Sequence, residues 1–459
     1  MHDSVSVVGL GKLGMCLAAC AASKGMRVIG VDLSPRTVAL VNQGQPPVLE
    51  PGLAEMIESN RERLKATHDM NSAVAESSIT FVVVPTPSEP SGAFSLHYVV
   101  HAIQEIGKSL RNKNDYHLVV IVSTVLPGAT DFGILPILEQ SSGKSCGADF
   151  GLCYGPEFIA LGNVLRGMLR PDFVLIGESD ARAGMILQDW YQHFCENSPP
   201  ISRMNFVNAE LTKIAVNTYV TTKISFSNML SAICEQLPGA DVDTVTNALG
   251  LDSRIGRRYL TGGLGYGGPC FPRDNQALAF TAKTLGCRAT LAEATDAMNR
   301  SLCAGMVNRI TSIVPRGKKV GILGLAYKPG TNVIEESQPL AIARRLAAEG
   351  YSLVLFDSLA LDNVRLLLRD EVSYAHSLPE CLNEADAVII TSPGEEFRKL
   401  RASDFPRRQD PIAVFDCWRI LQHELSGCDW LRYIPFGVGN DEMAASARLA
   451  NVWQTAAAG

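Results

Sequence analysis

The stretch SVSVVGLGKLG, residues 4–14, decides the fold of the first part of the chain. A short apolar run precedes three glycines in the spacing GxGxxG, a helical segment follows at 15–23, and a second apolar run at 26–32 ends in Asp32. In a βαβ unit this combination gives a tight turn, close approach of backbone to a pyrophosphate, a helix N-terminus behind the phosphates and a carboxylate for the ribose hydroxyls. We therefore predict a dinucleotide-binding unit. The three glycines are Gly9, Gly11 and Gly14.

The acid at the end of the second strand also indicates which dinucleotide binds. Asp32 favours NAD over NADP, because a carboxylate there repels the 2′-phosphate of NADP. Arg36 lies close by in sequence and keeps NADP open. Sharp turns at 84–87 and 123–128 follow later apolar runs, and ligands bind at the carboxyl ends of such strands. Besides the glycines and Asp32, the expected cofactor contacts are Leu13, Pro85, Thr86 and Thr124.

The rest of the chain repeats the alternation of apolar runs and helical stretches. Apolar runs continue to 173–177, which predicts a parallel sheet covered on both faces. A long helix is predicted over 205–237. In the last third the alternation restarts, and the run at 351–357 again ends in an acid. Because Gly321 and Gly324 do not complete GxGxxG, we assign no second dinucleotide.

The predicted fold class is α/β, with two doubly wound Rossmann-like domains joined by a central helical region that contains a long helix. A chain of 459 residues is too long for a single core. The predicted boundaries are 1–200 for the first Rossmann domain, 201–300 for the helical region and 301–459 for the second Rossmann-like domain.

Composition excludes several classes of protein. The net charge is −6, with no basic tail, so we expect no nucleic-acid partner. No apolar segment reaches transmembrane length, and the chain starts without a signal-peptide pattern, so no membrane association is expected. The 12 cysteines are scattered and are interpreted as reduced cytoplasmic thiols. His97 and His101 have i,i+4 spacing but no third ligand near in sequence, so no metal is expected.

The segment GGLGYGGPCFPRD, residues 262–274, has five glycines in seven residues and then Cys270. Because glycine has no Cβ, such a loop lets backbone approach a ligand closely and offers N–H groups to it. A thiol in that place is interpreted as a nucleophile. The alternative is a glycine-rich loop that holds an incidental buried cysteine.

Lys213 and Asn217 are spaced i,i+4, so they share one face of the predicted long helix. The residues between them, 214–216, are apolar and are expected to be buried. A lysine and an asparagine on a packed face need partners, and the pKa of a buried lysine is tunable. A solvated pair on an amphipathic helix is the alternative.

Together these motifs resemble the UDP-glucose/GDP-mannose dehydrogenase family, the nucleotide-sugar 6-dehydrogenases. The resemblance covers nearly the whole chain, in the order of the family, and the Cys270 loop is specific to that family. The matching segments are the N-terminal GxGxxG with Asp32, Glu50–Leu53, Pro85–Pro87, Ser123–Thr124 with Pro127–Gly128, Pro156–Phe158, Glu210–Asn217, Asp252–Gly256, the Cys270 loop and Gly324–Lys328.

The resemblance implies an NAD-dependent four-electron oxidation of a sugar C6 alcohol to a carboxylate. In that reaction a thiolate at Cys270 traps the intermediate aldehyde as a thiohemiacetal, which is oxidised to a thioester and hydrolysed. The resemblance assigns the central region to dimerisation and catalysis, and the C-terminal domain to the nucleotide sugar. A homodimer or larger homo-oligomer is therefore expected.

The resemblance also implies roles for single residues. Lys213 stabilises an oxyanion with the help of Asn217, and Asp274 supports proton transfer or positions Lys213. Thr124 and Glu157 orient and activate water. The implied catalytic residues are Cys270, Lys213, Asp274, Asn217, Glu157 and Thr124. The implied substrate contacts are Glu157, Phe158, Lys213, Asn217, Arg254, Gly267, Lys328 and Arg419, of which Arg419 is the weaker match.

Departures from the family pattern bear on the substrate. Leu161 stands where many relatives have a second Glu, and TNVIEES at 331–337 lacks an Asp pair and an Arg. Arg273 and Pro269 also replace the usual residues beside the thiol. We expect UDP-glucose, with GDP-mannose or a UDP-N-acetylhexosamine as alternatives. A two-electron β-hydroxyacid dehydrogenase has no need for the thiol loop, and an inactive nucleotide-sugar-binding homologue stays a further alternative.

Overall fold

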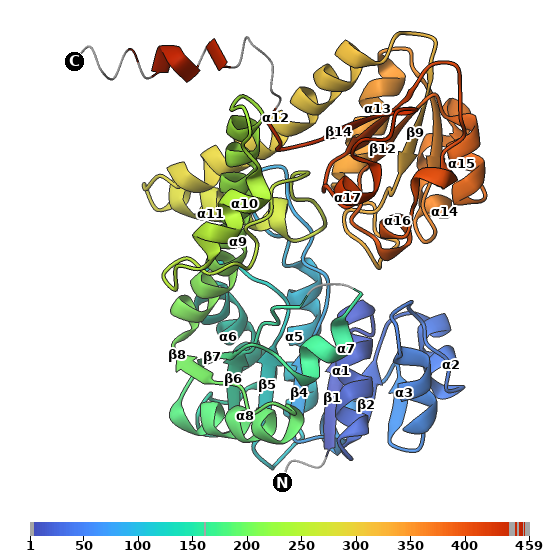
Figure 1. Ribbon diagram of the computed structural model, residues 1–459. Coiled ribbons are helices and arrows are strands. Elements are labelled where there is room, and N and C mark those ends of the chain that lie inside the picture. The colour runs from blue at the N-terminus through green and yellow to red at the C-terminus, as the bar shows by residue number, and fades with distance from the viewer. Residues whose placement is uncertain (1–3, 160–161, 440–445, 448, 453, 455–459) are drawn as a thin grey trace. The chain divides into compact units, whose positions relative to one another are not determined.

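The computed structural model describes residues 4–159, 162–439, 446–447, 449–452 and 454. The chain divides into two compact units. The first unit comprises Met1–Val216 with Phe280–Cys287, and the second comprises Asn217–Ala279 with Arg288–Gly459. The α/β class and the two doubly wound sheets that the sequence predicts are confirmed, one sheet in each unit (Figure 1).

The first unit is built on a sheet whose described strands number eight, in the order β3-β2-β1-β4-β5-β6-β7-β8. Its neighbours are parallel except that β7 runs antiparallel to β6, with Tyr154 opposite Gly177. This pair departs from the wholly parallel sheet that the sequence predicts. The strands are β1 (Ser4–Val8), β2 (Arg27–Val31), β3 (Leu64–Thr67), β4 (Ile79–Val82), β5 (His117–Ile121), β6 (Phe150–Tyr154), β7 (Val174–Glu178) and β8 (Ile201–Met204).

Helices cover both faces of this sheet, which is why its strands are apolar throughout. Val7 and Phe81 point to the face covered by α1, α3, α7 and α8, whereas Val82 and Val119 point to the face covered by α4, α5 and α6. The helices are α1 (Lys12–Ser23), α2 (Pro35–Asn42), α3 (Leu53–Ser59), α4 (Met70–Glu76), α5 (His97–Leu110), the π-helix η1 (Thr130–Ile134), α6 (Leu135–Ser142), α7 (Val164–Leu169) and α8 (Ala181–Phe194).

The predicted long helix is α9 (Phe206–Cys234), which begins in the first unit and continues into the second. Its length of 29 residues agrees with the predicted span of 205–237. Three further helices follow before the second sheet. They are α10 (Val242–Gly250), α11 (Phe271–Thr284) and α12 (Thr290–Ile313).

The second sheet is wholly parallel, and its described strands have the order β11-β10-β9-β12-β13-β14. Its strands are β9 (Lys319–Leu323), β10 (Ser352–Phe356), β11 (Ser373–Tyr374), β12 (Ala387–Ile390), β13 (Ile412–Asp416) and β14 (Leu431–Pro435). Its helices are α13 (Gln338–Ala348), α14 (Leu361–Leu368), η2 (Arg369–Glu371), α15 (Leu378–Glu384), α16 (Glu395–Arg398), η3 (Ala402–Asp404) and α17 (Gln422–Leu425).

The described residues also bear on membranes and metals. None of their helices is long and apolar enough to cross a membrane. They contain no group of three or more His, Cys, Asp or Glu side chains that could hold a metal ion. His97 and His101 lie at the start of α5, on an ordinary helix.

Candidate functional site

The glycine turn after β1 is closely packed at Gly9 and Gly14 and open at Gly11. A Cβ on Gly14 would lie 1.8 Å from Gly9 O, and one on Gly9, whose φ is +92°, would lie 2.4 Å from Val83 O. Helix α1 therefore starts as close to the strand ends as backbone allows. At Gly11, the N-cap of α1, an added Cβ would meet nothing within 4 Å, and no side chain caps the helix. This open helix N-terminus fits a pyrophosphate.

The acid that follows β2 supports the same turn. Asp32 Oδ2 accepts a hydrogen bond from Leu10 N at 2.8 Å, and its Oδ1 accepts one from Ser34 N at 2.8 Å. A carboxylate has about four acceptor positions, so the half-buried Asp32 keeps capacity for ribose hydroxyls. Arg36 is exposed on α2. These residues fit a dinucleotide with a free ribose 2′-hydroxyl.

The loops that follow β4 and β5 are tied to each other and to α9. Ser123 Oγ accepts a hydrogen bond from Val84 N at 2.9 Å and donates one to Val84 O at 2.7 Å. The buried carboxylate of Glu210 accepts hydrogen bonds from Gly128 N at 2.6 Å and Thr130 N at 2.8 Å. These bonds fix the two strand ends that carry Pro85, Thr86 and Thr124.

The loop after β6 brings three of the predicted site residues together. Lys213 Nζ donates to the backbone oxygen of Glu157 at 2.5 Å and lies 4.6 Å from the ring centroid of Phe158. Desolvation raises the pKa of Glu157 to about 7, although Lys213 and the hydroxyl of Tyr191 act in the opposite direction. Glu157 is thus a carboxylate that exchanges a proton near neutral pH, as a general base must.

Glu50, in a segment quoted above for the family resemblance, acts on that same loop. Its side chain is 6% exposed and accepts hydrogen bonds from Gly162 N at 3.2 Å and Val164 N at 2.8 Å. The carboxylate therefore satisfies N–H groups at the start of α7. Leu161 lies outside the described residues.

The second unit holds the cysteine and the remaining predicted catalytic residues. Asp274, in the first turn of α11, is 0% exposed, and its Oδ2 accepts a hydrogen bond from Asn217 Nδ2 at 2.6 Å. Its Oδ1 accepts a weaker bond from Arg273 Nε at 3.3 Å. Cys270 immediately precedes α11, and its carbonyl oxygen accepts the N–H of Asp274 at 2.9 Å.

Exposure separates Cys270 from most other thiols in the chain. All 12 cysteines lie in the described part of the chain, and only Cys270 and Cys287 are exposed. The alternative of an incidental buried cysteine is therefore wrong for Cys270. Cys287 lies in the first unit, just after α11.

The glycines that precede Cys270 are packed tightly against other parts of the second unit. An added Cβ would lie 2.1 Å from Glu336 O at Gly267 and 2.5 Å from the Tyr327 ring at Gly268. Packing inside the second unit therefore already requires glycine at these two positions, and the approach of the loop backbone to a ligand stays a prediction. At Gly262, Gly263 and Gly265 the nearest atoms belong to Val242, Trp418 and Asn299, at 3.0, 2.7 and 2.3 Å.

The remaining predicted substrate contacts differ in exposure and in how many of their side-chain N–H groups already have partners. Arg254 is exposed and forms an ion pair with Asp252 at 2.6 Å. Lys328 is half-buried, in the loop after β9. Arg419 is buried, and all five of its guanidinium N–H groups find acceptors within the second unit, so we do not propose it as a phosphate ligand. Those acceptors are both carboxylate oxygens of Asp243 and the carbonyl oxygens of Gly262, Cys417 and Phe436.

Three buried asparagines in the second unit escaped the sequence analysis as site residues: Asn228, Asn275 and Asn299. Each uses its carboxamide on the Cys270 loop or on the start of α11. No local sequence pattern marks them, because their partners lie 9 to 54 residues away.

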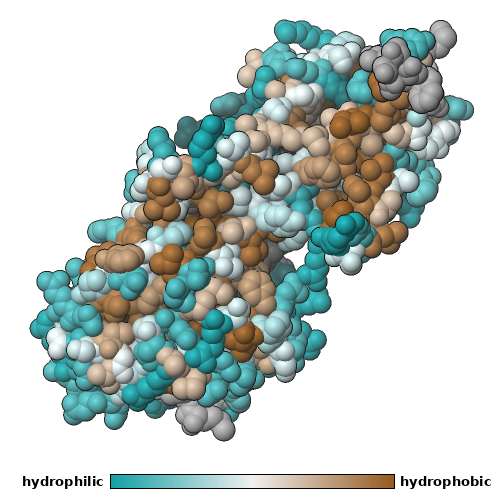
Figure 2. All heavy atoms as spheres, turned by 90° about the vertical axis from the view of Figure 1, so that its left-hand side faces the viewer, coloured by the Kyte–Doolittle hydropathy of each residue, from teal (hydrophilic) through white to brown (hydrophobic). Residues whose placement is uncertain are grey.

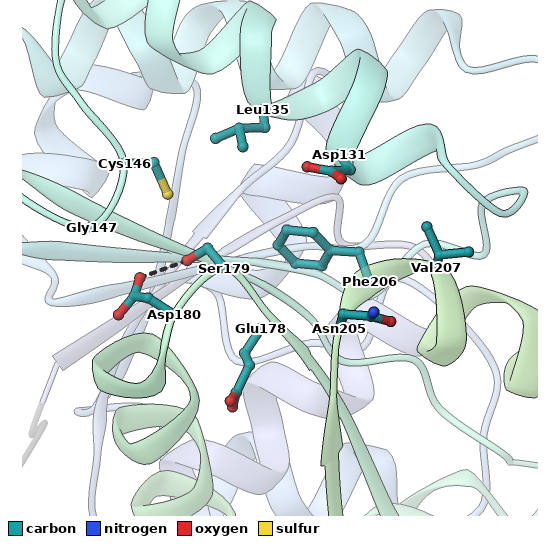
Figure 3. A pocket seen from close by; sticks show the side chains of 10 residues that line it. All are labelled: Asp131, Leu135, Cys146, Gly147, Glu178, Ser179, Asp180, Asn205, Phe206 and Val207. Carbon is teal, nitrogen blue, oxygen red and sulfur yellow. Dashed lines mark hydrogen bonds between the residues drawn. The ribbon is translucent and has the colours of Figure 1, made fainter.

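A pocket of about 320 Å³ in the first unit holds none of the predicted residues (Figure 3). Two of its carboxylates already have partners, since Glu178 accepts from Arg203 Nε and Asp180 accepts from Ser179 Oγ. We assign it no role in the reaction. Its lining residues are Asp131, Leu135, Cys146, Gly147, Glu178, Ser179, Asp180, Asn205, Phe206 and Val207.

Three family models match successive parts of the chain. All three describe the UDP-glucose/GDP-mannose dehydrogenase family: its NAD binding domain matches residues 3–195, its central domain 207–301 and its UDP binding domain 321–423. The NAD-binding model agrees with the glycine turn and Asp32, so the cofactor prediction of NAD is confirmed.

Characterised relatives are named for two different substrates. A UDP-glucose 6-dehydrogenase of Haloferax volcanii is 36% identical over 414 residues, which cover 89% of this chain and 95% of the relative. A GDP-mannose 6-dehydrogenase of Pseudomonas aeruginosa is 35% identical over 357 residues, which cover 77% and 80%. A solved UDP-glucose dehydrogenase from Pyrobaculum islandicum is 32% identical and has a TM-score of 0.86, with coverage of 96% and 98%.

Proposed function

Because the chain belongs to the UDP-glucose/GDP-mannose dehydrogenase family, we propose that it oxidises the C6 alcohol of a nucleotide sugar through to the carboxylate. The chain is an NAD-dependent nucleotide-sugar dehydrogenase. The observation that carries the four-electron reaction is the exposed Cys270 at the start of α11, close in sequence to the buried Asp274 and its partner Asn217. A two-electron alcohol oxidation needs no such thiol.

The first unit holds the cofactor in this proposal. Backbone N–H groups at the start of α1 bind the pyrophosphate beside Gly11, and Asp32 accepts hydrogen bonds from the ribose hydroxyls. Pro85, Thr86 and Thr124 lie in the loops after β4 and β5, at the carboxyl end of the sheet. NAD, when bound, accepts one hydride in each of the two oxidations.

Cys270 makes the second oxidation possible. Its thiolate attacks the carbonyl carbon of the aldehyde, a C–S bond forms, and the oxygen takes up a proton to give a thiohemiacetal. Oxidation of that adduct gives a thioester, and attack by water breaks the C–S bond and releases the acid and the thiol. The positive end of α11 lies at Cys270 and favours the negative thiolate.

Charged and polar neighbours complete the proposed chemistry. Lys213 and Asn217 stabilise the negative oxygen that develops at C6, while Asp274 holds the carboxamide of Asn217 in one orientation through the bond at 2.6 Å. Glu157, whose pKa is raised to about 7, takes the proton of the attacking water, and Thr124 orients it. Arg254 and Lys328 are the proposed contacts of the substrate diphosphate, and Phe158 and Gly267 those of the rest of the substrate.

UDP-glucose is the proposed substrate, and GDP-mannose and the UDP-N-acetylhexosamines are the alternatives. The test supplies limiting UDP-glucose, UDP-GlcNAc, UDP-ManNAc and GDP-mannose in parallel and measures NADH formed per sugar. Two NADH per UDP-glucose support the proposal. Turnover of GDP-mannose alone contradicts the choice of sugar, one NADH per sugar contradicts the role of Cys270, and no NADH from any of them supports an inactive homologue.

We also propose that the chain forms a homodimer through α9. In the second unit, Tyr219, Phe226, Met229 and Ile233 are 38–64% exposed, although they repeat at helical spacing on one face. Figure 2 shows the side of the molecule that faces left in Figure 1, where hydrophobic side chains gather on the surface. Light scattering should give twice the chain mass, and Phe226→Glu should give a smaller particle.

The thiol chemistry supports a proposal for the compartment. The nucleophile must be reduced to act, and all 12 cysteines are free in the structure. Reduced thiols persist in reducing compartments, so we propose that the protein works in the cytoplasm. Labelling of Cys270 in intact cells, compared with labelling after lysis under oxidising conditions, tests this.

A further inference from the structure

An asparagine from outside the Cys270 loop holds the loop backbone at Tyr266. Asn299, on α12, is 4% exposed. Its Oδ1 accepts a hydrogen bond from Tyr266 N at 2.9 Å, and its Nδ2 donates one to Tyr266 O at 2.9 Å. One carboxamide therefore bonds both backbone groups of a buried loop residue, and Gln338 Nε2 adds only a longer bond to Tyr266 O, at 3.4 Å.

A glycine makes this contact possible. A Cβ at Gly265 would lie 2.3 Å from Asn299 Oδ1, which is closer than any real Cβ contact. The carboxamide therefore reaches Tyr266 only because residue 265 has no side chain. Gly265 and Asn299 form a matched pair, although 34 positions separate them in the chain.

The side chain of Tyr266 extends the anchor to α11. The Tyr266 hydroxyl donates to Asp296 Oδ1 at 3.2 Å and accepts from Asn275 Nδ2 at 3.0 Å. Asn275 is the fifth residue of α11 and is 1% exposed. Both ends of the short segment from Gly267 to Cys270 are therefore attached to the same buried polar network.

A second asparagine holds the beginning of the loop. Asn228, on α9, accepts from Gly263 N at 2.8 Å and donates to Leu264 O at 3.3 Å. Asn228 thus fixes the first half of the loop, and Asn299 fixes the half that leads directly to the thiol. The position of Cys270 depends more directly on Asn299.

We propose that Asn299 is a positioning residue for Cys270: its pairing with the backbone of Tyr266 sets the place of the thiolate relative to the aldehyde carbon. The inference rests on the proposed nucleophilic role of Cys270. A displaced thiol forms the C–S bond too slowly, and the aldehyde then leaves after the first two-electron oxidation instead of being carried to the acid. The effect differs in kind from a loss of stability, because it changes the products.

Asn299→Asp tests the proposal with little change in size. The variant keeps an acceptor for Tyr266 N but sets an oxygen against Tyr266 O, where the native Nδ2 donates. The assays are run well below the unfolding temperature of the variant. We expect kcat for acid formation to fall about 10- to 100-fold and the KM for NAD to stay unchanged. We also expect between one and two NADH per sugar, and free aldehyde that hydroxylamine traps. A kcat close to wild type with two NADH per sugar would overturn the proposal.

Two further variants serve as a control and as a second test of the Asn299 contact. Asn308→Asp makes the same chemical change at an exposed position of α12 and should keep wild-type kcat and products. Gly265→Ala disturbs the contact of Asn299 with Tyr266 from the side of the loop. It should reproduce the aldehyde release, and it replaces Asn299→Asp as the test if that variant fails to fold. Wild-type products from a folded Gly265→Ala variant would contradict the proposal.

Cys270→Ser separates this inference from the function on which it rests. If Cys270→Ser still forms acid with two NADH per sugar, the proposed function itself fails. If Cys270→Ser forms no acid while Asn299→Asp forms it normally, only the positioning role fails.

Discussion

The two sheets place an aspartate after equivalent strands, yet the two carboxylates have different amounts of acceptor capacity left. Asp32, after β2, accepts two backbone N–H groups. Asp357, after β10, accepts four, from Leu325, Ala326, Leu359 and Ala360. A carboxylate has about four acceptor positions. Backbone N–H groups of other residues therefore occupy all the acceptor positions of Asp357, whereas Asp32 can still accept hydrogen bonds from a ribose.

The turns beside these aspartates differ in the same direction. Gly11 directly caps α1, and an added Cβ there meets open space. Gly9 and Gly324, which directly follow β1 and β9, are alike in that each has a positive φ and would place a Cβ 2.4 Å from a neighbouring atom. The difference is that α1 begins at Lys12, whereas α13 begins only at Gln338. A doubly wound sheet therefore becomes a dinucleotide site only where a helix N-terminus and an unfilled acid meet at the turn.

The largest effect tests whether NAD binding is independent of the covalent chemistry. Cys270→Ser should lower acid formation by a factor of about 10³ or more, because the attacking thiolate is gone. NAD binding by the first sheet should stay unchanged in calorimetry. Normal acid production would contradict the covalent route, and a weakened NAD complex would contradict the separation of the two roles.

Paired substitutions of the aspartates test the contrast directly. Asp32→Ala should raise the KM for NAD about 10-fold, because hydrogen bonds to the ribose are lost. Asp357→Ala should leave that KM unchanged but lower the free energy of unfolding by about 2–4 kcal/mol, because four backbone N–H groups lose a charged acceptor. Equal effects of the two variants on NAD would refute the distinction.

A smaller effect concerns Glu157. Its pKa is raised to about 7, first by desolvation, so the base form appears as pH rises through 7. We expect kcat/KM to increase over that range and Glu157→Gln to lose this increase.

The effect of the same pKa on stability has the opposite sign. A carboxyl group whose pKa is raised in the folded state contributes fully to the free energy of unfolding below its ordinary pKa, and this contribution is lost as pH rises through 7. The unfolding midpoint of Glu157→Gln should therefore depend less on pH between 5 and 8, and parallel wild-type and variant profiles would contradict the assignment.

The smallest effect concerns Arg36, which the sequence left as an argument for NADP. Because its side chain is exposed on α2, we expect Arg36→Ala to change the KM for NAD less than about twofold. A marked loss of NADP use in that variant would show that the guanidinium reaches a 2′-phosphate. Initial rates with both cofactors decide this.

Patterns that repeat within a few residues were enough to predict much of the molecule. The strand, glycines, helix and Asp32 lie within some thirty residues, so their chemistry is visible locally. The same holds for Lys213 and Asn217 on α9, and for the long helix itself. The antiparallel β7 was not visible, because strand direction depends on the path of the chain and not on the composition of the strand.

The sequence therefore determined the α/β class, the glycine turn with Asp32 that binds NAD, and the family. It also singled out Cys270 among the cysteines. The tertiary structure decided why the glycines before Cys270 are there, what Arg419 does and which asparagines hold the loop. The physical reason is distance along the chain: Asn299 meets Tyr266 across 33 residues, and Arg419 meets Asp243 across 176. Such contacts arise from packing, and no local spacing encodes them.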